Sequence, residues 1–244
     1  MKTCIIVPCY NEAERLPVTA FQEYLRDNPG IHICFVDDGS QDNTKAVLQQ
    51  LEAAMPTQVT ALILPQNQGK AGAVRAGMLH KAPELYDCLG YLDADLATPL
   101  DAIQDLEAVL AAQPGLDLVM GSRIKFLGTD IQRDTFRHYT GRVIATFISN
   151  ILRLPVYDSQ CGAKLFRRRV VTALFQEAFL SPWLFDVELL ARLIQMHGRQ
   201  HLLRGHVAEM PLRQWIEQHD SRVKMSYFFR LWYEMYRIHQ KYRT

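Results

Sequence analysis

The first half of the chain alternates short apolar runs with amphipathic segments. The apolar runs have the length and the β-branched content of strands, and they lie at 3–7, 31–36, 59–64, 88–92 and 116–121. Segments with helical spacing of apolar positions separate them, at 16–26, 44–55, 71–80 and 100–112. Near-continuous apolar strands that alternate with helices are typical of a mostly parallel sheet covered on both faces. The pattern therefore predicts an α/β fold.

This alternation stops after residue 123. A longer helix is expected at 136–152 and shorter ones at 170–175 and 187–196, with the polar turn DSQCG at 158–162 before them. No low-complexity linker or internal repeat interrupts the chain, so we expect residues 1–224 to form one domain with two halves, 1–123 and 124–224. Residues 225–244 are predicted to form a separate amphipathic helix.

Composition and charge restrict the classes of function. The 27 basic and 26 acidic residues give a net charge of +1, which provides no overall attraction for nucleic acid. The five cysteines are odd in number and lack CxxC spacing, which favours reduced thiols in a cytoplasmic protein: Cys4, Cys9, Cys34, Cys88 and Cys161. A strand begins almost at Met1, so we expect no signal peptide, and no apolar run reaches the ~18 residues of a membrane span.

Candidate ligand-binding residues follow each of the first four predicted strands. Because the carboxyl ends of parallel strands meet at one edge of a sheet, where ligands bind, we expect these side chains to lie together. They are Pro8, Tyr10, Asn11 and Glu12, then Asp37 and Asp38, then Asn67, Gly69 and Lys70, and finally Asp93 and Asp95.

Two of these residues indicate a metal site. Asp93 and Asp95 stand one residue apart after an apolar strand, and carboxylate oxygens suit Mg²⁺ or Mn²⁺, which complete their coordination with substrate phosphates and water. Ala71 occupies the position that a Walker A loop gives to Ser or Thr, and no GxGxxG follows the first strand, so neither a P-loop nucleoside triphosphatase nor a dinucleotide dehydrogenase is expected. The histidines lack a zinc-binding spacing.

Several motifs together resemble a known family. PCYNE, VDDGS, NQGKAGA, DADLATP and GSR occur in this order. The chain thereby resembles the family 2 inverting glycosyltransferases of GT-A fold. DSQCGAKLF, WLFDVELL and PLRQWIEQHDSRVK in the second half are similar to the dolichyl-phosphate β-glucosyltransferase branch. Ala97 stands where related mannosyltransferases often carry a metal-contacting Gln, which favours the glucosyl branch.

The resemblance implies a role for each matching residue. The first half would bind a nucleotide sugar, with UDP-glucose the expected donor, and the second half would be a helical acceptor lobe. Lys70 would lie near the diphosphate, Asp93 would contact the nucleotide or the metal, and Asp95 would be the main ligand of Mg²⁺ or Mn²⁺. The base and ribose would contact Pro8, Tyr10, Glu12, Asp37 and Asp38.

The acceptor implied by the resemblance is a polyprenyl phosphate. Its second pKa is near ~6, so its oxygen is already an anionic nucleophile at neutral pH and needs no general base. It does need fixed cations, and the forked guanidinium of arginine suits a phosphate. At positions that match the family, the candidates are Arg123, Arg137 and Arg222.

Other functions stay open on the sequence alone. The donor could be GDP-mannose or UDP-N-acetylglucosamine. A sugar hydroxyl acceptor would require a carboxylate base, for which Asp186 or Glu188 would be candidates. A non-catalytic nucleotide-sugar sensor would not need Asp95 or the arginines, and a sugar-nucleotide pyrophosphorylase would need a glycine-rich, basic first loop that PCYNEAERLP lacks. The oligomeric state is open as well.

The carboxyl-terminal segment is both aromatic and basic. Residues 226–243 are predicted to form an amphipathic helix that rests on a membrane surface, which would bring a chain without a span to a lipid substrate. Packing of the same aromatic side chains against the second half is the alternative. Its apolar and aromatic side chains are Phe228, Phe229, Leu231, Trp232, Tyr233, Met235, Tyr236 and Ile238, and its basic ones are Arg230, Arg237, Lys241 and Arg243.

Overall fold

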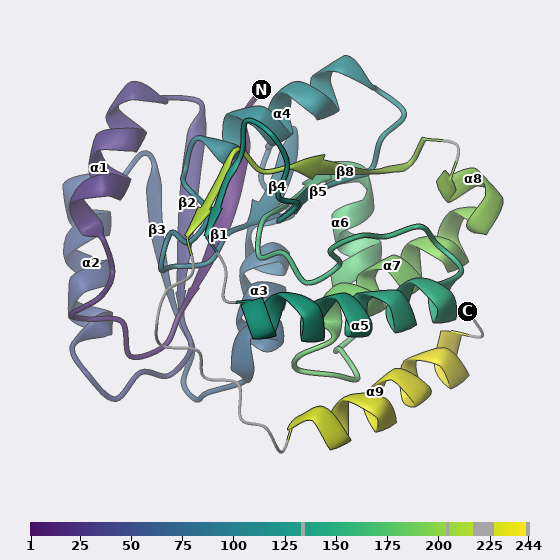
Figure 1. Cartoon of the computed structure of the whole chain (residues 1–244). Coiled ribbons are helices and arrows are strands. Elements are labelled where there is room, and N and C mark those ends of the chain that lie inside the picture. The colour runs from purple at the N-terminus through teal and green to yellow at the C-terminus, as the bar shows by residue number, and fades with distance from the viewer. Residues whose placement is uncertain (133–134, 204, 217–226, 243–244) are drawn as a thin grey trace.

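A seven-stranded sheet forms the centre of the molecule. The computed structural model describes residues 1–132, 135–203, 205–216 and 227–242, and orders the strands β3-β2-β1-β4-β7-β5-β8 (Figure 1). Among these strands only β7 runs antiparallel to its neighbours, β4 and β5, so the mostly parallel sheet is confirmed. The bounds are β1 Thr3–Cys9, β2 Ile31–Asp37, β3 Val59–Ile63, β4 Cys88–Tyr91, β5 Leu118–Ser122, β7 Lys164–Arg167 and β8 Val207–Pro211.

Helices cover both faces of the sheet. Side chains alternate between the faces of a strand, so Ile5 and Val7 of β1 enter one core while Cys4 and Ile6 enter the other. The first core is closed by α1 Val18–Asp27, α2 Thr44–Ala54 and α4 Ala102–Ala112. The second is closed by α3 Gly69–Lys81, α5 Thr135–Leu152, α6 Arg168–Phe175, α7 Phe185–His197 and α9 Tyr227–Tyr242.

Some elements of the second half were not predicted from the sequence. They are β7 and β8, the short helix α8 Arg199–Leu203, and a two-stranded sheet of β6 Asp130–Gln132 with β9 Gln214–Ile216. The backbone N–H of Ile216 donates to the carbonyl of Ala97 at 3.0 Å. This small sheet therefore lies against the loop that follows β4, where the paired aspartates stand.

Helix α9 packs against the protein along one side. Leu231, Met235 and Ile238 are almost fully buried in the core that α7 and α5 share, whereas Trp232 and Tyr233 are 48% and 62% exposed. The predicted helix is therefore present, but part of its apolar surface is used within the protein, as the packing alternative requires. Within the described residues, no helix has both the length and the apolar character needed to cross a bilayer.

Candidate functional site

Three loops are joined through Asp38 at the carboxyl edge of the sheet. The buried Asp38 donates its N–H to the Cys9 carbonyl at 2.8 Å, and its Oδ1 accepts the N–H of Gln68 at 2.7 Å. Gly39 beside it has a φ of +68°, and a Cβ there would lie 2.7 Å from the backbone nitrogen of Asn67. Burial raises the pKa of Asp38, against the lowering effect of the Gln68 N–H. The loops after β1 and β2 and before α3 are thus packed together.

The other predicted nucleotide contacts lie in the same loops. Asp37 is buried, and its Oδ1 accepts the N–H of Ser40 at 3.0 Å, so this carboxylate helps to shape the turn after β2. The Glu12 carboxylate accepts a hydrogen bond from Arg15 at 2.8 Å. Pro8 and Tyr10, at the end of β1 and directly after it, are partly exposed.

The paired aspartates lie beside Lys70. Asp93, after β4, forms an ion pair with Lys70 from the first turn of α3. Asp95 is exposed, and its Oδ1 accepts the N–H of Ala97 at 3.0 Å. Partial burial opposes the charge of Lys70, but the nearby carboxylates of Asp93, Asp186 and Asp95 raise its pKa. The cation of Lys70 and several acids therefore share this edge of the sheet.

The acid pair fits a hard divalent cation. Although Asp95 is exposed, partial desolvation of its carboxyl group raises its pKa, and the negative charge of Asp93 adds to the effect, so the two carboxylates are close enough to repel each other. Their oxygen donors suit Mg²⁺ or Mn²⁺, whose charge would relieve that repulsion. The Asp93 carboxylate can occupy its position because residue 162 is a glycine. A Cβ at Gly162 would lie 2.0 Å from Oδ2 of Asp93.

Arg123 is held rigidly by Asp158. Its Nε and Nη2 donate to the two carboxylate oxygens at 2.7 Å each, and its backbone N–H donates to Oδ2 at 3.0 Å. The guanidinium also lies 5.2 Å from the ring centroid of Trp215 in β9. Burial opposes its charge, but Asp158 raises the pKa of Arg123, so it stays a cation. Arg123 is fixed on one side and has further N–H groups for an anion.

The structure does not describe the side chains of the other two predicted arginines. Arg137 lies in the first turn of α5, and the structure does not describe its side chain. Arg222 falls outside the described residues. Their roles stay predictions.

The acid pair in α7 separates into two environments. Asp186 is buried beside the site, where its Oδ1 accepts a hydrogen bond from the Tyr91 hydroxyl and lies 2.6 Å from Lys164 Nζ. Glu188 is also buried but accepts from the Tyr242 hydroxyl at 2.6 Å and pairs with Arg192 at 2.8 Å. Glu188 therefore anchors α9 to α7.

The sequence did not assign roles to several residues around the site. Gly162 and Asp158 belong to the DSQCG turn, which carried the family resemblance but no individual role. Glu209 of β8 accepts hydrogen bonds from the backbone N–H groups of Tyr157 and Asp158 at 2.7 Å each, and so holds the start of that turn. For Asp158 and Gly162, the only signal in the sequence was an aspartate and a glycine in a polar turn.

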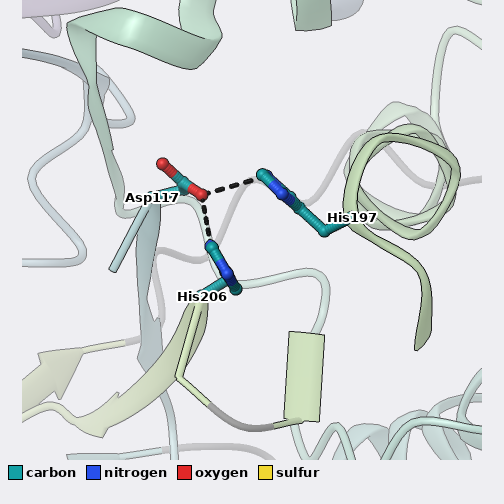
Figure 2. Close-up of side chains that lie close together, drawn as sticks. All are labelled: Asp117, His197 and His206. Atoms are coloured by element: carbon teal, nitrogen blue, oxygen red, sulfur yellow. Dashed lines mark hydrogen bonds and ion pairs between the residues drawn. The ribbon is translucent and has the colours of Figure 1, made fainter. Parts of the chain in front are cut away.

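A second cluster of possible ligands lies at the opposite edge of the sheet. Asp117 directly precedes β5, and its Oδ2 lies 2.7 Å from His206 Nδ1 and 3.0 Å from His197 Nε2 (Figure 2). The two imidazole rings stack at 4.2 Å with an 18° interplanar angle. Both imidazole nitrogens already lie within hydrogen-bond distance of the same Asp117 oxygen, and Arg169 pairs with the other oxygen of Asp117 at 2.6 Å. The geometry favours an ion-pair and hydrogen-bond cluster over a metal centre.

The fold and the acid-lined edge define an α/β protein of GT-A type. The family model for glycosyl transferase family 2 matches residues 4–175, so the chain belongs to that family. It is 33% identical over 236 residues to dolichyl-phosphate beta-glucosyltransferase ALG5C of Trichomonas vaginalis, covering 92% of this chain and 66% of that protein. It is 32% identical over 199 residues to dolichyl-phosphate beta-glucosyltransferase of Dictyostelium discoideum, covering 76% of this chain and 60% of the relative. The chain thus spans slightly less than two thirds of the length of these two relatives.

Solved structures show the same arrangement. Glucosyl-3-phosphoglycerate synthase from Mycobacterium tuberculosis, in complex with Mn²⁺, uridine diphosphate and glucosyl-3-phosphoglycerate, superposes with a TM-score of 0.67. The identity is 16%, and the match covers 99% of this chain and 79% of the synthase. At this identity the likeness shows the fold, and the expected GT-A architecture is confirmed.

Proposed function

We propose that this chain transfers glucose from UDP-glucose to a polyprenyl phosphate, with inversion at the anomeric carbon and with a divalent cation. The observation that carries the proposal is the cluster of Lys70, Asp93 and Asp95 at the carboxyl edge of the sheet, in a chain similar to dolichyl-phosphate beta-glucosyltransferases. A diphosphate that leaves from a sugar needs its negative charge neutralised, and this cluster combines a cation with metal-competent acids.

The donor would lie across the three packed loops. Pro8, Tyr10, Glu12, Asp37 and Asp38 would surround the base and ribose, since they stand at the ends of β1 and β2. Asp93 and Asp95 would hold Mg²⁺ or Mn²⁺, and the bound cation would neutralise the leaving diphosphate. Lys70 would lie beside the same diphosphate.

The acceptor phosphate would approach from the side of Arg123. Its oxygen attacks the anomeric carbon, the bond from that carbon to the diphosphate oxygen breaks, and UDP leaves with the bonding electron pair. Arg123 would hold this phosphate, with Arg137 and Arg222 as further predicted cations. No proton has to be removed from an ionised phosphate, and Glu188 is buried against Arg192 and Tyr242, so this residue is not the base that a hydroxyl acceptor would require.

Contact with a membrane surface would bring the enzyme to its lipid. Helices α5 and α9 present an exposed aromatic patch, which we define as Val143, Phe147, Trp232, Tyr233 and Tyr236, with exposed fractions of 42–62%. The rings of Phe147 and Trp232 meet edge to face at 4.6 Å and join the two helices. Aromatic side chains with nearby basic residues are typical of interfacial helices.

One experiment tests the reaction. Purified protein is incubated with UDP-glucose, GDP-mannose or UDP-N-acetylglucosamine, each with a short polyprenyl phosphate and Mn²⁺, and products are identified by mass spectrometry. The proposal predicts a glucosyl phosphopolyprenol from UDP-glucose alone. A product from another donor would change the assigned sugar, and transfer only to sugar hydroxyls would contradict the lipid acceptor.

A further inference from the structure

Lys164 is a fully buried cation whose hydrogen bonds all go to protein. Its Nζ lies 2.9 Å from the Ser159 carbonyl, 2.6 Å from the Cys161 carbonyl and 2.6 Å from Asp186 Oδ1. An ammonium has three donors, so these contacts use its full capacity. A buried ion pair contributes little net stability compared with apolar side chains of the same size. Stability alone therefore does not account for a charge at this position.

The contacts of Lys164 connect the parts of the site. It stands at the start of β7, and it joins the DSQCG turn to the first turn of α7. Through Asp186 it also reaches the hydroxyl of Tyr91, at the end of the strand that precedes Asp93. The ammonium therefore contacts the turn directly and the base of the acidic loop through Asp186.

The turn that Lys164 holds carries two contacts of the site. Asp158, at its beginning, accepts the two N–H groups of Arg123. Gly162, at its end, faces Asp93 so closely that a Cβ would lie 2.0 Å from the carboxylate. A displacement of this turn would move Arg123 and the space around Asp93 together.

We propose that Lys164 is a positioning residue that fixes Arg123 relative to Asp93. It acts through the carbonyl oxygens of the turn and through Asp186, and it does not touch the reacting atoms. The inference rests on the proposed glucosyl transfer for its activity readout, but a binding measurement tests it independently of the acceptor.

The test removes the charge of Lys164 with and without that of its partner. Lys164→Met leaves the buried Asp186 without its cation, so we expect a lower thermal midpoint and poor folding. Lys164→Met with Asp186→Asn removes both charges and keeps an acceptor for Tyr91. This double variant should recover the midpoint, while turnover stays about 10- to 100-fold low and the affinity for Mn²⁺ with UDP weakens by about the same factor.

The control is a second buried ion pair on the same helix. Arg192 lies 2.8 Å from Glu188, and its guanidinium donates to the carbonyls of Leu174 and Ala178 at 2.6 and 3.0 Å. Arg192→Met with Glu188→Gln changes charge and hydrogen bonding in a comparable way, but these residues make none of the site contacts described above. We expect turnover and affinity for Mn²⁺ with UDP within about twofold of the wild-type values, below the loss expected for a group that supports a ligand.

The measurements are calorimetry of UDP with Mn²⁺, steady-state kinetics and thermal denaturation. If the Lys164 double variant behaves like the control, Lys164 only balances a buried charge and the proposal is overturned. If the wild-type chain binds UDP with Mn²⁺ but transfers no glucose to polyprenyl phosphate, the proposed function fails, and calorimetry alone still decides the role of Lys164. A wild-type chain that does not bind UDP with Mn²⁺ would contradict both.

Discussion

At the scale of single residues, the absence of a side chain at Gly162 determines how closely the turn approaches Asp93. Gly162→Ala would place a methyl group 2.0 Å from a carboxylate oxygen, so the carboxylate or the turn must move. We expect a loss of turnover of about 10- to 100-fold, because Asp93 would leave its supported position. Steady-state kinetics check this. The control is Gly115→Ala, whose nearest neighbour would lie 3.6 Å away, and equal losses in the two variants would contradict the role given to Gly162.

The exposed carboxylate of Asp95 is the predicted main ligand of the divalent cation. Asp95→Asn keeps the size of the side chain and can still accept the N–H of Ala97, but it removes the negative charge. A cation that stabilises a leaving diphosphate contributes several kcal/mol, so we expect a loss of turnover of about 1000-fold. Excess EDTA should reproduce the loss in the wild-type chain, and reconstitution with Mn²⁺ should reverse it. Near-normal turnover in the variant or in EDTA would remove the metal role.

Because the Arg123 fork is engaged by Asp158, a change there has to keep this carboxylate paired. Arg123→Lys keeps the charge but loses the planar fork. We expect a higher Michaelis constant for the lipid phosphate, or a lower turnover. The change should correspond to a lost interaction free energy of about 1.5–3 kcal/mol. Affinity for UDP should change little. Arg137→Ala is expected to behave in the same way, and calorimetric loss of UDP binding in either variant would move that arginine to the donor side.

At the scale of elements, the apolar runs of the first half were sufficient to predict five strands of the sheet. Those runs have the length of strands, and helices with regular apolar spacing separate them from one another. The same reasoning missed β7, because Lys164 and Arg167 bracket only two apolar residues in a four-residue strand. Lys164 is nevertheless buried, since carbonyl oxygens and Asp186 replace water around it. Contacts between residues far apart in the chain decided this strand, and local pattern does not contain them.

The candidate site shows the same division. Asp38, Asp93 and Asp95 could be predicted because each follows a strand whose direction the alternation gives. Asp158 and Glu209 could not, since their importance depends on where the second half folds back against β5. The sequence predicted a polar turn at DSQCG and a family resemblance there, but only the structure relates this turn to Arg123 and Asp93.

The cluster of Asp117, His197 and His206 should make the free energy of unfolding depend on pH. Burial lowers the pKa of His197, and the neighbouring His206 and Arg169 lower it further. Asp117 opposes this shift. The folded state then binds fewer protons than the unfolded state, so stability is lost as the pH falls below the ordinary value of about 6.5. We expect His197→Gln to lose less stability than the wild-type chain between about pH 7.5 and about pH 5.5, measured by urea denaturation. His32 shifts in the same direction in both proteins, so only the difference is attributed to His197. Equal losses would contradict the assignment.

At the scale of the whole molecule, helix α9 has one face in the core and one face outside. Leu231, Met235 and Ile238 pack with α7 and α5, so removal of residues 224–244 would expose that core and disturb the fold. A truncation therefore does not separate membrane contact from stability. Substitutions on the exposed face do separate them, because these side chains contribute little to the core.

The last prediction concerns the aromatic patch of α5 and α9. Trp232→Gln, Tyr233→Gln and Tyr236→Gln, combined in one chain, should keep the fold because all three side chains are at least 48% exposed. Flotation with anionic liposomes should fall, since polar amides do not enter the interface as aromatic rings do. Nearby basic residues such as Arg237 would contribute roughly 1 kcal/mol each, so the remaining binding should weaken with added salt. The control is Leu85→Gln with Met196→Gln, two exposed apolar side chains outside the patch. Equal flotation of the triple variant, the control and the wild-type chain would show that the patch is not the membrane contact.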